Sequence, residues 1–514
     1  MGLFLGTHTL YSLQEVFSEY DLDWLFQKTM DPENFNDSRL GNALDAIYDH
    51  APTIYGDIIT RAIREFKLDL RSLNLDGTKI LLYGEYDTPE NYMEHAETIA
   101  YPMRGWNHEG RKDLKQLSFQ LMVTGEQIPV LYSVADGNAS ETEEYQKVMK
   151  RLHTINGDLQ KSVLVADSKM CSAPTLIDAT EQKLRLVTLV PDSFSIRKEL
   201  IQSTLNKGTD ELVLLMKTAD GEEYRGMSYR LPILVDLQNG DTVKTEHVVW
   251  RYLVVHSSRR EKELAERRVN ETADEKAKLE KRIKKFERDL YFCEADAKQA
   301  TVAFIKALNQ KFHAVEWETL ENVTKPGKGR TPAKGAKISD RTGWGIKIRL
   351  AEKPPTNNPY SPEAMFVLLT TVSDCRILSD ADILEGYKGR NVVEMCFKWM
   401  KGPAAVAPVF LKYPSRIQAL GFVLVVWMLV YALIQREIRR KLQEGEKVRH
   451  PGNKRTEKPT TRGVLQTFST IGRVLWRTDK NGGSQIQNFT SDHQLLLNIL
   501  GIPNLYQENL PRAT

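Results

Sequence analysis

The chain has 514 residues, 41% of them hydrophobic and 27% charged, which are values typical of a folded protein with several domains. Its formal net charge of +3 is too small to indicate a nucleic-acid partner by itself. The four cysteines are scattered and form no CxxC pair, a pattern that predicts reduced thiols, an intracellular protein and no zinc site.

The N-terminal part of the chain, residues 10–66, contains three amphipathic stretches that predict three helices. Asn36 and Asp37 precede the second stretch as capping residues, and Pro52 marks the break before the third. A small helical region of this kind could dock on DNA, although it has no evident helix-turn-helix pattern.

From about residue 72 the apolar residues follow strand patterns instead. Five strands are predicted before residue 192, with a helix at 140–155 between the third and the fourth. Three antiparallel strands, a helix and then a parallel strand is the order of a ribonuclease-H-like fold. Asp76 stands at the start of the first strand. Asp167 stands at the carboxyl end of the fourth, the edge at which open α/β sheets bind ligands.

Residues 192–370 interrupt this pattern. Strand patterns there precede a long charged helix at 258–292, which is either one solvated surface helix or a helical hairpin. Lys325–Arg349 contains eight Lys or Arg residues and one acid, which predicts a flexible basic arm or loop. A segment of this charge could contact a phosphate backbone. A further strand is predicted at 362–372.

The segment Tyr387–Lys401 reads as one helix because its apolar residues recur at steps of three and four. Tyr387, Arg390, Glu394 and Lys401 follow one another at steps of three, four and seven, which places all four on one helix face. A carboxylate in line with two cations and a phenol could hold a metal ion and bind phosphates. The spacing alone favours a simpler interpretation, a solvated face with an Arg390–Glu394 ion pair.

Residues 417–434 form an uncharged apolar stretch at the lower length limit of a membrane-spanning helix. A buried central helix of a large α/β core has the same hydropathy, and basic residues flank the stretch on both sides. The segment therefore predicts either a single membrane span or a core helix. A basic linker at 447–463 and two helices, at 465–477 and 491–502, complete the chain.

With Asp76, Asp167 and the Glu394 helix in place, the chain resembles the DDE transposases of bacterial insertion sequences, and among them insertion-sequence family four. In the Tyr-Arg-Glu-Lys subgroup of that family, two, three and six residues separate the four positions, and the segment Tyr387–Lys401 has this spacing. Relatives usually carry a longer N-terminus, which implies a shortened copy, and often a basic residue where Ser168 stands. Further similar segments are 75–86, 110–130, 134–138, 163–170, 251–263 and the tail from 465.

The resemblance implies an α/β fold with a ribonuclease-H-like catalytic core, a mixed five-stranded sheet with helices, which an inserted β/α domain interrupts. The apolar stretch at 417–434 would then pack inside the core, so no membrane is expected. The expected domains are a truncated, DNA-binding helical N-terminal region at 1–70, core parts at 71–191 and 371–445, the insertion at 192–370, and a basic linker with a helical C-terminal region at 446–514.

The resemblance also implies a transposase that cleaves DNA at the ends of an insertion sequence and transfers the cut strand into target DNA. Asp76, Asp167 and Glu394 would be catalytic and would hold two Mg²⁺ ions, for which Mn²⁺ can substitute. Clustered carboxylates repel one another, and hard divalent cations with oxygen ligands relieve that repulsion.

Tyr387, Arg390 and Lys401 would bind DNA through its phosphates. The expected partner is double-stranded DNA, bound by a homodimer in the bacterial cytoplasm and on the nucleoid. Three other functions fit the same residues. They are a ribonuclease-H-like nuclease that cuts without strand transfer, an inactive truncated copy that acts as a DNA-binding regulator, and a membrane protein with one span.

Overall fold

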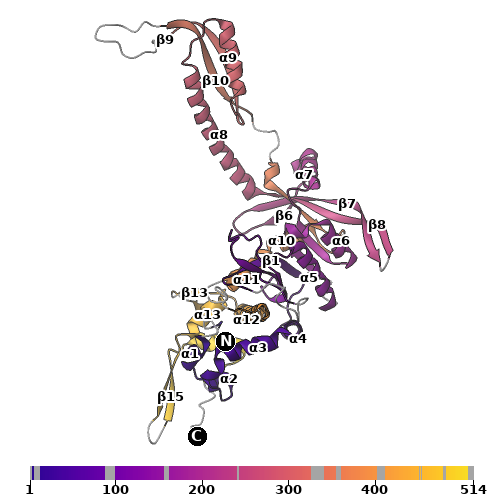
Figure 1. Cartoon of the computed structure of the whole chain (residues 1–514), viewed down its shortest axis with the longest axis vertical. Helices are drawn as coiled ribbons and strands as arrows, with labels where there is room; N and C mark the ends of the chain where they lie inside the picture. The colour runs from indigo at the N-terminus through magenta and orange to yellow at the C-terminus, as the bar shows by residue number, and fades with distance from the viewer. Residues whose placement is uncertain are drawn as a thin grey trace, which may run out of the picture. The chain divides into compact units, whose positions relative to one another are not determined.

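In the computed structural model the chain forms two compact units, each built from separate stretches of the sequence (Figure 1). Unit 1 comprises Met1–Ser193, Ser228–Leu253 and Leu368–Thr514, and unit 2 comprises Phe194–Met227 and Val254–Val367. The structure describes all residues except 1–2, 5–11, 87–98, 156–160, 240–241, 326–340, 355–359, 402–410, 451, 453, 478–481 and 507–514.

Among the described residues the largest β-sheet is mixed and has the strand order β3-β2-β1-β4-β5-β11-β8-β7-β6, in which β1 to β5 belong to unit 1 and β6 (Val213–Lys217) to unit 2. The five strands predicted before residue 192 are confirmed as β1 (Ser72–Leu82), β2 (Lys115–Thr124), β3 (Pro129–Asp136), β4 (Val163–Ala166) and β5 (Arg185–Leu189). The predicted sheet of five strands is too small, because β11 (Met365–Thr370) pairs antiparallel with β5. Next come β8 (Thr242–Ser257) and β7 (Glu223–Asn239), and these two strands and β11 each have residues in both units.

The register of β1 and β4 brings two acidic residues to neighbouring positions. The two strands are parallel, and Leu75 lies opposite Ala166 at the end of their ladder. Leu75 and Ala166 are fully buried, so the apolar side chains fix this register. The next residues along the two strands are Asp76 and Asp167, which therefore lie side by side at the carboxyl end of the parallel pair.

The segment Tyr387–Lys401 is two helices and not one, so the predicted single helix is wrong. α10 (Asp380–Lys388) ends at its C-cap Gly389, and α11 (Asn391–Lys401) begins after Arg390. The N–H of Arg390 donates to the Tyr387 carbonyl, and that of Val393 donates to the Arg390 carbonyl. These three-residue steps tighten the turn where glycine, a poor helix former, weakens the helix. The four polar residues of the segment therefore do not share one continuous helix face.

The N-terminal helices differ from the prediction at their ends. The first predicted helix is split into α1 (Leu13–Ser18) and α2 (Leu22–Phe26), and the 3₁₀ turn η2 (Pro32–Phe35) follows. The predicted cap is confirmed: the Asn36 side chain accepts a hydrogen bond from the Arg39 N–H at the start of α3 (Asp37–Tyr48). α4 (Ala51–Phe66) begins before Pro52, because proline is tolerated in the first turn of a helix.

The apolar stretch at 417–434 lies in α12 (Pro414–Lys441), which is long and apolar enough to cross a membrane, and no other helix among the described residues is. The length and apolar character of α12 are weak evidence for a membrane span, because 61% of its most apolar 18-residue stretch is buried inside the protein. α12 packs against α3, α4, α11 and β3. Arg416 at its start pairs with Asp45 of α3 at 2.7 Å.

The helices between the strands of unit 1 are α5 (Glu141–Ile155), the 3₁₀ turn η5 (Ser168–Met170) and α6 (Ala173–Glu181). In the C-terminal part the predicted helix at 465–477 is right only in its first part, because α13 (Thr461–Phe468) ends at Phe468. The second part is the strand β14 (Gly472–Arg477), which forms a hairpin with β15 (Gly482–Gln487). The predicted linker contains a short pair of strands, β12 (Val448–His450) and β13 (Lys454–Thr456), and the last predicted helix is confirmed as α14 (Ser491–Leu500).

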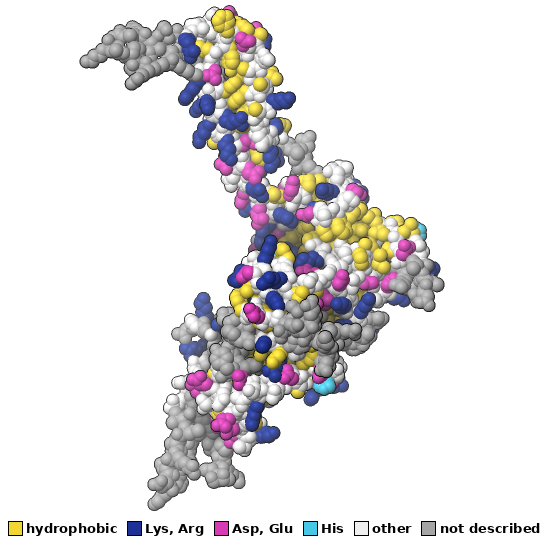
Figure 2. All heavy atoms as spheres, viewed as in Figure 1, with side chains coloured by type: hydrophobic (Ala, Val, Ile, Leu, Met, Phe, Trp, Pro, Cys, Tyr) yellow, Lys and Arg dark blue, Asp and Glu magenta, His cyan; other side chains and the backbone are white. Residues whose placement is uncertain are grey.

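Unit 2 contains one long helix, α8 (Ser258–Phe286), so the single-helix alternative is confirmed over the hairpin. Figure 2 shows Lys and Arg side chains interspersed with Asp and Glu along it. Leu279 and Ile283 of α8 pack in an apolar cluster with residues of α9 (Glu294–Lys306) and β10 (Arg341–Glu352). The other elements of unit 2 are α7 (Ser195–Lys207), η6 (Thr209–Glu211), β6 (Val213–Lys217), β9 (His313–Lys325) and η7 (Pro362–Ala364).

The predicted flexible arm is wrong over residues 341–349. These residues belong to β10, which pairs antiparallel with β9. Ile346 and Ile348 are buried while Lys347 and Arg349 are exposed, the two-residue period of a strand. Residues 326–340 of the predicted arm lie outside the described residues.

The packing of α12 gives a stability prediction. Val425 is fully buried, whereas Val430 on the same helix is 40% exposed. Val425→Asp should lower the free energy of unfolding by more than about 3 kcal/mol, because it buries an unpaired charge. The matched change Val430→Asp should cost less than about 1 kcal/mol. Urea unfolding in detergent-free buffer measures both. Equal effects of the two variants, or recovery of the protein only in detergent, would contradict this packing.

Candidate active site

The centre of the candidate site is the pair of aspartates at the end of β1 and β4. Asp76 is the fifth residue of β1 and not at the strand start as predicted, and its Oδ1 accepts the Gly77 N–H at 2.8 Å. Asp167 caps η5, where its Oδ1 accepts the Lys169 N–H at 3.1 Å. Both side chains are half-buried, and backbone N–H groups hold both carboxylates.

Burial and mutual repulsion make this pair costly to ionise. Burial, and next the negative charge of Asp167, raise the pKa of Asp76 to about 6, and Glu394 adds a smaller rise. Burial also raises the pKa of Asp167, against the opposing effect of its hydrogen bond from Lys169. The positive charge of Arg390 lowers the pKa of both aspartates. A divalent cation would relieve the same repulsion.

The break between α10 and α11 places Arg390 beside the aspartates. α10 packs against β4 and β5, and α11 packs against β1 and β2. The Arg390 guanidinium lies over the Tyr387 ring, 5.4 Å from its centroid. Burial raises the pKa of the Tyr387 phenol, and the charge of Arg390 opposes this. The two helices therefore hold a cation and a phenol next to the acidic pair.

Glu394 and Lys401 are less closely associated with the Asp76–Asp167 pair than Arg390 is. Glu394 lies in the first turn of α11 with its side chain exposed, and it acts on Asp76 through its charge. Lys401 ends α11 and donates a hydrogen bond to Glu109 Oε1 at 3.3 Å. The charge of Lys401 helps to lower the pKa of Glu109, although burial acts in the other direction. The structure thus brings Asp76, Asp167 and Arg390 together and pairs Lys401 with a different acid.

The residues fit a hard divalent cation by their chemistry. Asp76 and Asp167 offer carboxylate oxygens, which Mg²⁺ and Mn²⁺ prefer, and their repulsion favours a cation between them. Across the described residues, no three His, Cys, Asp or Glu side chains approach closely enough to hold a metal ion. Glu394 would have to move toward the aspartates to complete a set of three.

Several residues near the pair were not predicted from the sequence. Lys169 forms an ion pair with Glu141, in the first turn of α5. Its ammonium group also lies 5.8 Å from the ring centroid of Trp106, whose side chain is 60% exposed. The proximity of Lys169 to Asp167 in the sequence was a usable signal. The contact between Trp106 and Lys169 could not be predicted from the sequence, because it depends on the fold of a distant loop.

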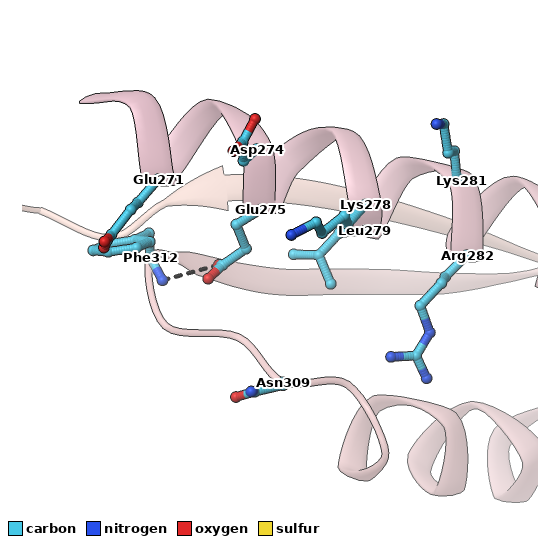
Figure 3. Close-up of a pocket in the computed structure, with 9 residues that line it drawn as sticks. All are labelled: Glu271, Asp274, Glu275, Lys278, Leu279, Lys281, Arg282, Asn309 and Phe312. Atoms are coloured by element: carbon cyan, nitrogen blue, oxygen red, sulfur yellow. Dashed lines mark hydrogen bonds between the residues drawn. The ribbon is translucent and has the colours of Figure 1, made fainter. Parts of the chain in front are cut away.

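One hollow of about 690 Å³ lies between α8 and the loop that precedes β9 (Figure 3). Glu275 lines it and accepts hydrogen bonds from the backbone N–H groups of Lys311, Phe312 and His313. These bonds mark Glu275 as a staple between the helix and the loop. All residues that line the hollow belong to unit 2, whereas all predicted site residues belong to unit 1.

Fold and site together define a mixed α/β protein with an acidic centre at the carboxyl ends of parallel strands. A family model described as Transposase DDE domain matches residues 73–426, and a model described as a domain of unknown function matches residues 1–60. None of the curated proteins compared with the chain matches it. Because the first match covers more than half of the 514 residues, the chain belongs to the transposase DDE domain family. Family membership supports transposase activity, an enzyme activity on nucleic acid.

The raised pKa of Asp76 gives a pH-dependent stability prediction. An acid whose pKa is higher in the folded than in the unfolded state destabilises the fold at high pH, and this effect disappears as the pH falls toward its ordinary value of 3.8. Asp76→Asn should therefore raise the free energy of unfolding of the metal-free protein at pH 7.5 by up to about 3 kcal/mol. The gain should be nearly absent at pH 4.

Urea unfolding at the two pH values measures this effect. Asp113→Asn is the control, because the hydrogen bond from Arg111 lowers the pKa of Asp113 to about 2. Its removal should not stabilise the protein at pH 7.5. A loss of stability in Asp76→Asn at pH 7.5 would show that Asp76 does not stand in a repulsive pair.

Proposed function

We propose that the chain is a transposase that cleaves DNA at the ends of an insertion sequence and transfers the cut strand into target DNA, with two divalent ions held by Asp76, Asp167 and Glu394. The observation that carries the proposal is the repulsive Asp76–Asp167 pair beside Arg390. The family match over residues 73–426, which spans all three acids, supports it.

We also propose a ribonuclease-H-like core. The antiparallel strands β3, β2 and β1, followed by the parallel strands β4 and β5, support this assignment. The insertion domain at 192–370, the other predicted domain bounds and the Tyr-Arg-Glu-Lys subgroup of insertion-sequence family four belong to the same proposal. The subgroup rests on the spacing of Tyr387, Arg390, Glu394 and Lys401.

In this mechanism the chain holds and orients the reacting phosphate. When bound, the ions would supply an activated water or 3′-OH and stabilise the leaving oxygen. Arg390 would bind a phosphate with two parallel hydrogen bonds, and Tyr387 would donate one more. Lys401 would reach the DNA only after leaving Glu109, so its phosphate contact requires the loss of that pair. Glu394 would approach the two aspartates when DNA binds.

The partner in this proposal is double-stranded DNA, bound by a homodimer. We assign the protein to the cytoplasm and, with DNA, to the nucleoid, and we treat α12 as a core helix. The burial of most of its apolar residues and its ion pair with Asp45 support that choice. The helical region at 1–70 is proposed to contact DNA.

The proposal predicts that Asp167, at the end of β4, and Glu394, in the first turn of α11, are both essential. Asp167→Ala and Glu394→Ala should each lower Mg²⁺-dependent nicking of DNA that carries the element ends by at least about 100-fold. Glu385→Ala is the matched control, because Glu385 is exposed on α10. It should nick at the wild-type rate.

Gel analysis of the products separates nicking from strand transfer. Wild-type joined products are expected, and nicked products without joined ones would favour a nuclease. Wild-type nicking by Asp167→Ala or Glu394→Ala would refute the assignment of these residues. Circular dichroism of each variant should match the wild type, because removing a repelling acid does not disrupt packing.

A further inference from the structure

A buried hydroxyl without a partner lies close to the acidic pair. Tyr145 of α5 is fully buried, and its hydroxyl makes no hydrogen bond to any described residue. Buried polar groups normally find a partner, because an unsatisfied one costs free energy. An orphan hydroxyl of this kind therefore points to a partner that the protein acquires in another state.

The N-terminal turn of α5 faces the turn that holds Asp167. Glu141, in the first turn of α5, forms an ion pair with Lys169, and the backbone N–H of Lys169 donates to the Asp167 carboxylate. Tyr145 follows Glu141 by four residues and so lies on the same face of the helix. This places Tyr145 one turn further along α5, on the side that faces η5 and Asp167.

The Tyr145 hydroxyl also lies close to Gly77, the residue that follows Asp76 in β1. A Cβ atom built at Gly77 would lie 3.7 Å from the Tyr145 hydroxyl oxygen, which is an ordinary van der Waals distance. The Gly77 N–H in turn donates to Asp76 Oδ1 at 2.8 Å. The Tyr145 hydroxyl thus lies close to the residue that follows Asp76, and Tyr145 lies on the face of α5 that is turned toward Asp167.

The electrostatics agree with this placement. Burial first, and then the negative charges of Asp167 and Asp76, raise the pKa of Tyr145 well above its ordinary value of 10.0. The phenol therefore stays protonated. Because ionised carboxylates only accept hydrogen bonds, the Tyr145 hydroxyl can interact with Asp76 or Asp167 only as a donor.

We propose that Tyr145 is a positioning residue of the metal site, whose hydroxyl donates a hydrogen bond to the Asp167 carboxylate when that carboxylate binds a divalent ion. The inference rests on the proposed function, because it requires the aspartates to be metal ligands. Groups that orient metal-binding carboxylates in this way commonly change metal affinity by 10- to 100-fold. Tyr145 would take the role without contacting the metal or the DNA.

A second orphan offers a competing explanation. The Gln120 Oε1 atom is also buried without a hydrogen-bond partner among the described residues, and the Gln120 amide nitrogen lies 3.8 Å from the same Cβ position at Gly77. A small rotation could let Gln120 accept the Tyr145 hydrogen bond. In that case the hydroxyl would serve the packing of the sheet and not the metal site.

The test uses the full chain and Mn²⁺ as the probe. Tyr145→Phe removes only the hydroxyl, and it should weaken Mn²⁺ binding about 10- to 100-fold, measured by electron paramagnetic resonance titration. The unfolding midpoint of the metal-free protein should stay unchanged or rise, because an unsatisfied buried group has been removed.

Tyr55→Phe is the matched control, because the Tyr55 hydroxyl is buried and donates to the Pro129 carbonyl at 2.8 Å. It should lower the unfolding midpoint and leave Mn²⁺ affinity unchanged. Gln120→Leu should also leave Mn²⁺ affinity unchanged.

Three outcomes would overturn the inference about Tyr145 alone: wild-type Mn²⁺ affinity in Tyr145→Phe, an equal loss of affinity in Gln120→Leu, or an equal loss in Tyr55→Phe. The proposed function fails in a different way. A wild-type chain that binds no Mn²⁺, or an Asp167→Ala variant that binds it like the wild type, would refute the metal site and the Tyr145 inference with it.

Discussion

The repulsion between Asp76 and Asp167 is the constraint on which the rest of the site depends. The parallel register that pairs Leu75 with Ala166 places the two carboxylates side by side, and burial makes their ionisation more costly still. Backbone N–H groups and the charge of Arg390 offset part of this cost. A fold that keeps such a pair must be stable elsewhere, and the buried strands on both sides of it provide that stability.

The second half of the site comes from the break at Gly389, where two helices meet. α11 buries Val393, Cys396, Phe397 and Met400 against the sheet and α12, which leaves its opposite face to carry Glu394. The break itself points Arg390 toward the aspartates and not along α11. The same short segment therefore provides a structural anchor, a cation for the acidic pair and a carboxylate that can approach it.

The sequence was most informative where one physical pattern was enough. Apolar runs predicted β1 to β5, and their order identified Asp167 as a residue at the end of a parallel strand. The break at Gly389 was missed because the apolar period continues through it, so only the local hydrogen-bonding reveals it. The Lys401–Glu109 pair joins residues far apart in the chain, and no local pattern encodes it. The strand β14 has an apolar run that fits a helix equally well.

The most direct measurement of the central claim is iron-directed cleavage of the polypeptide. Fe²⁺ bound in place of Mg²⁺ generates hydroxyl radicals with ascorbate and peroxide, and these cut the backbone near the metal. With DNA present, the account predicts cuts near residues 76, 167 and 394 that excess Mg²⁺ suppresses and that Asp167→Ala abolishes. Cuts confined to one of these segments, or cuts elsewhere that Asp167→Ala does not change, would contradict a metal site shared by the three acids.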